Sequence, residues 1–137
     1  MNAEVKKLWV DALRSGEYEQ CKNALKANGG YCCLGVLNQL YVDTHGVTWE
    51  DSLKYQEEVY TGDPFKYKHQ DEDLPPKAQK WAGLDSSNPR VNVGNRQYYQ
   101  LATLNDTGID PIIFPDFCPG SGPLNFSQIA DLIEKEL

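Results

Sequence analysis

Two adjacent cysteines, Cys32 and Cys33, are the residues of this chain that most invite a chemical interpretation. A thiol beside a histidine base is the minimal arrangement for thiol-dependent hydrolysis or group transfer. The two histidines, His45 and His69, lie in loop-like stretches, and no spacing brings either of them to a cysteine. Adjacent cysteines are poorly placed to bond to each other, and no C-x-x-C pair indicates a zinc site. We therefore expect reduced, metal-free thiols that act as small hydrophobic residues.

A polar pair, Asn105-Asp106, ends a helix predicted over residues 99–106. A carboxylate is electrostatically unfavourable at a helix C-terminus, and a residue that breaks a local rule is a candidate for function. Alternatively, the pair hydrogen-bonds the turn at Gly108 and fixes the angle between two helices. Arg14 ends the first predicted helix, where a cation is favourable, so it needs no function there. It could pair with Asp106 or face an anionic ligand.

Aromatic residues supply the remaining recognition chemistry. A ligand ring could stack on Tyr18, Tyr31, Trp49, Tyr98 or Tyr99, with Arg14 or Arg90 for phosphates. Each aromatic residue taken alone is better explained as part of the core. The residues that we predict to bind a ligand or partner are Arg14, Tyr18, Tyr31, Asn105, Asp106, Phe114 and Phe117.

Helices dominate the elements that must position these residues. Asn2 can cap a helix to about Arg14, with one apolar stripe formed by Val5, Leu8, Trp9, Ala12 and Leu13. A second helix runs from about Cys33 to Gly46, and a third begins at 74–76, buries Trp81 and ends at Gly83. The fourth covers 99–106, and a capping box at Asn125 opens the last.

Strand signals are short. Residues 18–26 predict a strand, Asn28-Gly29-Gly30 a turn, and 91–98 a hairpin around Gly94-Asn95. The fold class is therefore α+β: a single domain over 1–137 with about five helices packed on a small antiparallel sheet or hairpins. At 137 residues the chain is long enough for one core.

The segment 109–124 holds four of the eight prolines together with several large apolar residues. Proline bars a regular helix here, and a polar loop would need no such apolar content. The segment is either a lid packed over the core or an insert that contacts a partner or a second copy of the chain. We favour partner contact for Phe114 and Phe117.

The formal charge of −7 and the scattered basic residues argue against a general nucleic-acid binder. The C-terminal helix resembles the start of a helix-turn-helix, but the charge and the long loop before it disfavour DNA binding. No window approaches the roughly 18 apolar residues of a membrane span. The N-terminus lacks the apolar stretch of a signal peptide, so we expect no membrane partner and a cytoplasmic protein.

Five segments, taken in order, resemble a known family. They are 9–20 (W-x-x-A-L-R-S-G-x-Y-x-Q), 31–37 (YCCLGVL), 74–84 (LP with WAGL), 101–108 (LA-x-LND-x-G) and 126–134 (F-x-x-IAD-x-IE). Together they are similar to small proteins carried by tailed bacteriophages and prophages. The similarity covers most of the chain, although 109–124 departs from it. It implies an accessory phage gene acting in the bacterial host cytoplasm, and it brings no activity.

The sequence contains no phosphate-binding glycine loop, no G-x-S-x-G elbow and no H-E-x-x-H motif. We therefore expect a non-catalytic phage accessory binding protein without cofactor or metal. Its partner would be a host protein that it occludes or a small nucleotide-like signal that it sequesters, as a host-defence antagonist does. Two alternatives remain: a small hydrolase or transferase that uses a thiol or the Asn105-Asp106 pair, and a minor virion or assembly component.

Overall fold

The structure, a computed structural model, describes residues 1–53, 73–94, 96–108 and 123–137. Its described helices are α1 (Ala3–Arg14), α2 (Cys33–His45), α3 (Trp49–Leu53), α4 (Pro76–Ala82), α5 (Leu101–Asp106) and α6 (Phe126–Glu136). Its described strands are β1 (Lys26–Ala27), β2 (Gly30–Tyr31), β3 (Arg90–Asn92) and β4 (Tyr98–Gln100). The α+β class predicted from the sequence is confirmed.

Local side-chain signals set the ends of the helices. Oδ1 of Asn2 accepts hydrogen bonds from the N–H groups of Glu4 and Val5 at 2.9 and 3.2 Å, which caps α1. Helices α2 and α4 end at Gly46 and Gly83, which have φ angles of 64° and 69°. Glycine adopts this left-handed conformation at no steric cost, so the helices end where the sequence predicted.

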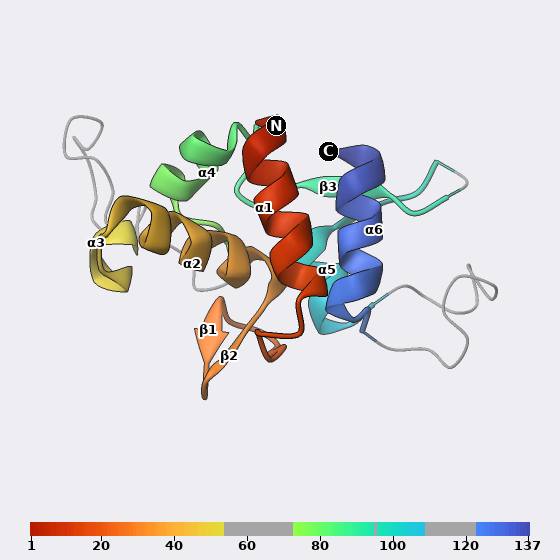
Figure 1. The fold of residues 1–137 in the computed structure, drawn as a ribbon. Coiled ribbons are helices and arrows are strands. Elements are labelled where there is room, and N and C mark those ends of the chain that lie inside the picture. Colours follow the sequence, from red (N-terminus) through yellow and green to blue (C-terminus); the bar gives the residue numbers. More distant parts are fainter. Residues whose placement is uncertain (54–72, 95, 109–122) are drawn as a thin grey trace, which may run out of the picture.

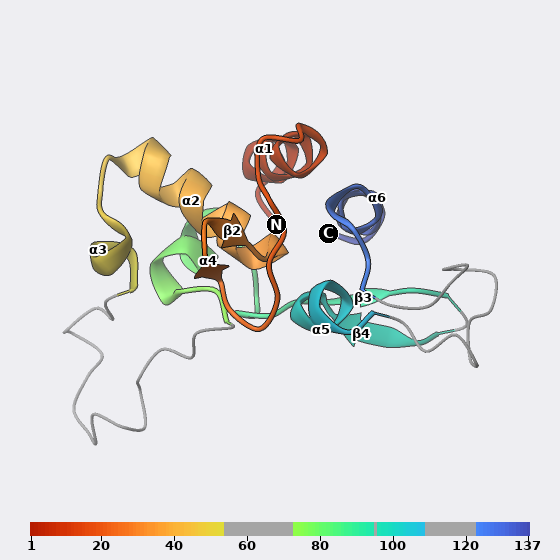
Figure 2. The same ribbon diagram turned by 90° about the horizontal axis from the view of Figure 1, so that it is seen from below.

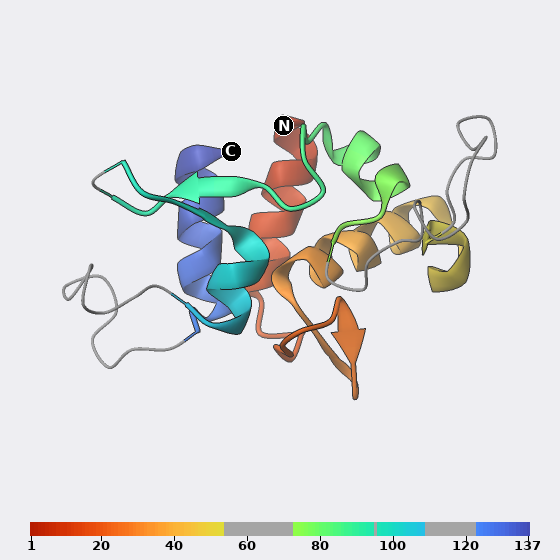
Figure 3. The same ribbon diagram turned by 180° about the vertical axis from the view of Figure 1, so that it is seen from behind.

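Helices α1 and α6 lie side by side and antiparallel, with both termini at one end of the pair (Figure 1). Helix α2 crosses beside them and carries α3 and α4 at its far end. Seen from below, α1 and α6 form one layer, with α5 and the β3–β4 hairpin under α6 (Figure 2). Figure 3 shows that hairpin lying across the back of α6. No helix in the described ranges is long and apolar enough to span a membrane.

The described strands form two separate antiparallel hairpins, in agreement with the small sheet or hairpins predicted from the sequence. In the first, Ala27 pairs with Gly30, so Asn28 and Gly29 form the turn, with φ angles of 52° and 82°. In the second, Val91 pairs with Tyr99. The strand predicted over 18–26 is wrong: only an isolated bridge at Gln20 and the two residues of β1 pair. This stretch is mostly polar and exposed, so little apolar burial supports a longer strand.

One core joins the helices. Trp9 is fully buried, as predicted, and its indole Nε1–H donates to the carbonyl of Cys33 at 2.9 Å. Trp81 was expected in the core but is only half-buried: it packs against the edge of the core, with its ring 5.8 Å from that of Tyr41. The fourth predicted helix begins at Leu101 rather than Tyr99, since the preceding residues pair in β4.

Helix α3 was not predicted, and it places Trp49 beside α2. The lid or insert predicted over 109–124 lies mostly outside the described residues, and with it Phe114 and Phe117. At its end, Leu124 is fully buried, and its N–H donates to the carbonyl of Leu104 at 2.9 Å.

Candidate functional site

The two adjacent thiols serve the fold. Sγ of Cys32 accepts a hydrogen bond from the N–H of Gly35 at 3.3 Å and so caps α2. Cys33 is fully buried, with Sγ 3.7 Å from the carbonyl oxygen of Leu101. Burial raises the pKa of Cys32 to about 12 and the pKa of Cys33 well above its ordinary value. Both groups therefore remain protonated thiols at neutral pH, which makes them poor nucleophiles.

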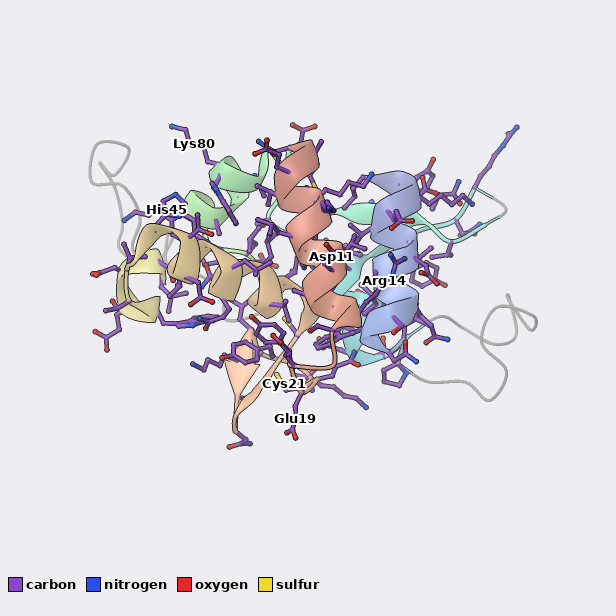
Figure 4. The ribbon with its side chains drawn as sticks, in the orientation of Figure 1. Asp11, Arg14, Glu19, Cys21, His45 and Lys80 are labelled. Atoms are coloured by element: carbon purple, nitrogen blue, oxygen red, sulfur yellow. The ribbon has the colours of Figure 1, made fainter. Side chains whose placement is uncertain are left out.

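No cysteine meets a histidine base in the described part of the chain. His45 lies at the exposed C-terminal end of α2, where its Nδ1 is 2.9 Å from the carbonyl oxygen of Tyr41 (Figure 4). Cys21 is half-buried, and desolvation raises the pKa of its thiol as well. The residues that the structure describes contain no cluster of three or more histidine, cysteine or carboxylate groups that could hold a metal ion. His69 and Cys118 lie outside the described ranges.

Asn105 is a fully buried hydrogen-bonding hub. Its Oδ1 accepts from Nε2 of Gln20 at 2.9 Å and from the N–H of Cys33 at 3.2 Å. Its Nδ2 donates to the carbonyl of Cys21 at 2.8 Å and to Oδ1 of Asp106 at 2.8 Å. The side chain thus satisfies both its donor and its acceptor groups while it ties α5 to α2 and to the segment before β1.

The partners of this pair differ from those expected. Oδ1 of Asp106 also accepts from the N–H of Asn23 at 3.0 Å, whereas the N–H of Gly108 donates to the carbonyl of Thr103. Asn105 and Asp106 therefore bind residues 20–23 rather than the turn at Gly108. This arrangement assigns the two side chains a positioning role.

Arg14 pairs with α6 and not with Asp106 (Figure 4). Its Nη2 lies 2.6 Å from Oδ1 of Asp131, and its Nη1 lies 2.8 Å from Oε2 of Glu134. Hydrogen bonds to Asp131 and then to Glu134 raise the pKa of the guanidinium. Two carboxylates already occupy the fork that an anionic ligand would need, so Arg14 is a poor phosphate contact in this arrangement.

Three half-buried rings gather beside the first hairpin, from Tyr18, Tyr31 and Trp49, and we call them the aromatic face. The rings of Tyr18 and Tyr31 meet edge to face, with centroids 5.3 Å apart and an interplanar angle of 88°. The rings of Tyr31 and Trp49 lie 6.1 Å apart at 41°. Three segments far apart in the sequence therefore converge on one partly exposed surface.

Polar contacts from α2 hold the aromatic face. Oε1 of Gln39 accepts from the indole Nε1–H of Trp49 at 2.6 Å and from the hydroxyl of Tyr31 at 3.4 Å. Nε2 of Gln39 donates in turn to Oδ1 of Asp43 at 2.7 Å. Because Gln39 and Asp43 are four residues apart, they share one side of the helix.

The Asn105 hub supports the aromatic face from behind. The N–H of Tyr31 donates to the carbonyl of Glu19 at 2.7 Å, and the N–H of Cys21 donates to the carbonyl of Tyr31 at 2.9 Å. These bonds fix the segment that carries Tyr18 against β2. Since Asn105 binds the same segment through its contact with the carbonyl of Cys21, α5 is coupled to the placement of the rings.

Charge around the aromatic face is mixed. Desolvation raises the pKa of the Tyr18 hydroxyl, and the carboxylates of Asp43 and Glu17 raise it further. The ammonium of Lys26 lies over the rings of Tyr31 and Trp49, 5.4 and 5.2 Å from their centroids. The face thus combines ring surfaces, two nearby acids and one amine.

Three other features of the described surface stay apart from this face. A pocket of about 230 Å³ is lined by residues from both chain ends, by the segment before β3 and by Arg90 of β3, and by none of the three rings. Toward the C-terminal end of α2, Tyr41 and His45 pack against Trp81 of α4. Tyr98 is 61% exposed on β4 and touches neither ring group.

The profile of a domain of unknown function, DUF8296, matches residues 1–137. The chain belongs to this family. No curated protein and no solved structure matches it. Membership in the DUF8296 family describes the whole chain and names no activity.

The structure brings together only some of the residues predicted to bind. Tyr18 and Tyr31 lie in contact, and Asn105 with Asp106 lies behind them, whereas Arg14 is engaged with α6. Gln39 and Lys26 were missed. Gln39 could have been found from the sequence, because its spacing of four residues from Asp43 places both side chains on one side of α2. The position of Lys26 depends on the hairpin register, which the sequence did not reveal.

Proposed function

We propose that this protein is a non-catalytic binding protein that contacts a partner protein through the aromatic face. The main support for this proposal is that Tyr18, Tyr31 and Trp49 remain half-exposed although hydrogen bonds and ring contacts hold them in place. Aromatic side chains that are fixed before binding lose little conformational entropy, and they dominate the energetics of many protein interfaces. A role as a phage accessory protein in the bacterial cytoplasm, occluding a host protein, is supported by the sequence resemblance alone.

The electrostatics favour a protein over a nucleotide-like ligand. The arginine predicted to bind phosphate, Arg14, is bound by Asp131 and Glu134. The ammonium of Lys26 lies over the faces of Tyr31 and Trp49, where a nucleotide base would have to stack. Two acids near the aromatic face, Asp43 and Glu17, would repel a phosphate group. The thiol-enzyme alternative loses support because burial raises the pKa of Cys32 and Cys33. No described feature favours a virion or assembly component.

Affinity capture from bacterial lysate with three tagged proteins tests the proposal: wild type, Trp49→Leu and Tyr98→Ala. Tyr98→Ala is the matched control, since it removes an exposed ring from β4, away from the aromatic face. We expect one protein, identified by mass spectrometry, to be retained by wild type and by the control. Trp49→Leu should reduce its recovery about tenfold or more.

Equal recovery of every protein with Trp49→Leu and wild type would contradict the proposal. Circular dichroism of the purified variants shows whether Trp49→Leu keeps its helices. If it does not, Tyr18→Ala serves as the second variant, because Tyr18 lies in an irregular segment rather than in a helix or strand.

A further inference from the structure

The aromatic face already holds a cation. Nζ of Lys26 lies 5.4 Å from the centroid of the Tyr31 ring and 5.2 Å from the centroid of the Trp49 ring. Both distances are within the roughly 6 Å over which the negative face of a ring attracts a cation. One ammonium therefore sits against two rings that come from different elements.

The rings do not depend on Lys26 for their placement. Trp49 and Tyr31 both donate to Oε1 of Gln39, and Tyr18 packs edge-on against Tyr31. Gln39 is in turn held by Asp43. The two ring faces would thus stay in position if the amine left, which is the property of a preformed binding site.

Lys26 is held only lightly in this position. It is exposed, it lies on a two-residue strand, and within the described ranges its ammonium forms no ion pair with a carboxylate. A lysine ammonium is strongly hydrated and sits on a flexible stem. Its departure into water therefore costs little, and another cation can take its place.

We propose that Tyr31 and Trp49 form a binding site for a basic side chain of a partner protein, and that the chain's own Lys26 occupies this site in the absence of the partner. An arginine suits the site best, because its guanidinium is weakly hydrated and stacks flat on aromatic rings. This inference deepens the proposed function and rests on it, since it specifies the chemistry of the partner segment.

The surrounding charge favours a basic partner over an acidic or uncharged one. Asp43 and Glu17 lie close enough to the face to raise the pKa of the Tyr18 hydroxyl. The whole chain carries a formal charge of −7. Such a surface draws a basic segment toward it and repels an acidic one.

Titration with a capped tetra-arginine peptide tests the inference, with a capped tetraglutamate peptide and tetramethylammonium as comparison probes. The readout is the indole N–H resonance of Trp49, assigned with Trp49→Phe. Lys26→Met keeps the apolar stem but removes the competing charge, so it should bind tetra-arginine about two- to five-fold more tightly than wild type. Lys22→Met is the control, because it removes the same charge from an exposed lysine that contacts neither ring.

Three results would overturn the inference. In the first, Lys26→Met binds tetra-arginine no more tightly than wild type. In the second, Lys22→Met gains as much affinity as Lys26→Met, and in the third, the Trp49 resonance responds to tetramethylammonium alone. The first would show that Lys26 does not compete, and the second that net charge explains the binding. The third would mean that the site takes a small cation and not a protein segment. The two experiments can fail independently. If tetra-arginine shifts the Trp49 resonance but the lysate yields no captured protein, the result supports this site and contradicts the proposed function.

Discussion

Cys32 and Cys33 are neighbours in sequence, but their thiols lie in different environments. Cys32 accepts a hydrogen bond at the start of α2, a position in which serine is a preferred capping residue. Cys33 is fully buried among apolar side chains, and the carbonyl oxygen of Leu101 lies 3.7 Å from its sulfur. The same substitution should therefore have different effects at the two positions.

We predict that Cys33→Ser lowers the free energy of unfolding by about 1–3 kcal/mol, because it buries a hydroxyl that is too short to reach Leu101 without movement. Cys32→Ser should stay within about 0.5 kcal/mol of wild type, since serine caps α2 equally well. Urea unfolding of the two variants checks this. A larger loss for Cys32→Ser would contradict the capping role.

Single residues were predicted from the sequence where one local rule decides them. The caps at Asn2 and Asn125 and the turn at Asn28-Gly29 follow from side-chain and backbone chemistry within a few positions. The contacts of Arg14 and Asn105 do not, because their partners lie more than 70 positions away in the sequence. The aromatic face was only half predicted, because the contacts that join Tyr31, Gln39 and Trp49 depend on how the first hairpin packs against α2 and α3.

At the scale of the elements, the backbone of α2 at Gly35 lies directly against the backbone of Leu25, just before β1. A Cβ atom built at Gly35 would lie 1.8 Å from the carbonyl oxygen of Leu25 and 2.7 Å from its carbonyl carbon. That carbonyl cannot easily retreat, because it accepts a hydrogen bond from the N–H of Cys32 at 3.1 Å. A glycine inside a helix, normally unfavourable, is here required by the packing of one backbone on another.

We predict that Gly35→Ala lowers the free energy of unfolding by about 2 kcal/mol or more, although alanine favours helices. Gly46→Ala is the control: it has open space around it, and its cost of about 1–2 kcal/mol comes from the positive φ alone. Thermal unfolding compares the two. If Gly35→Ala proved no less stable than wild type, the close approach to Leu25 would be refuted.

At the scale of the whole molecule, the α+β class and the two hairpins were predicted from the sequence, whereas the lengths of the strands were not. Strands of two or three residues carry too few side chains for an alternating pattern to show. Helix α3 was missed because only two of its five residues, Trp49 and Leu53, are apolar, and two others are acids. The core was largely predictable, since α1 and α6 each bury an apolar stripe. Leu8, predicted on the stripe of α1, is instead 48% exposed, and Val10 is buried.

The buried thiols also give the whole molecule a pH dependence. Cys32 has a pKa of about 12 in the folded protein, against an ordinary value of 9.0. Below about pH 9 the thiol is protonated in both the folded and the unfolded state, so its contribution to stability is constant. Between about pH 9 and 12 only the unfolded chain releases the proton. The free energy of unfolding must therefore fall as the pH rises through this window, and Cys33, whose pKa is raised further, acts in the same direction.

We predict that the thiol of Cys32 contributes a loss on the order of 1.5 kcal/mol by about pH 10. Cys32→Ser isolates this contribution, because serine does not titrate in the window and should preserve the cap. Tyrosines and lysines also titrate, but their effects are shared by wild type and variant and cancel in the comparison. Urea unfolding at about pH 8 and about pH 10 should therefore show a smaller loss for Cys32→Ser than for wild type. Equal losses would mean that the folded protein does not shield this thiol from water.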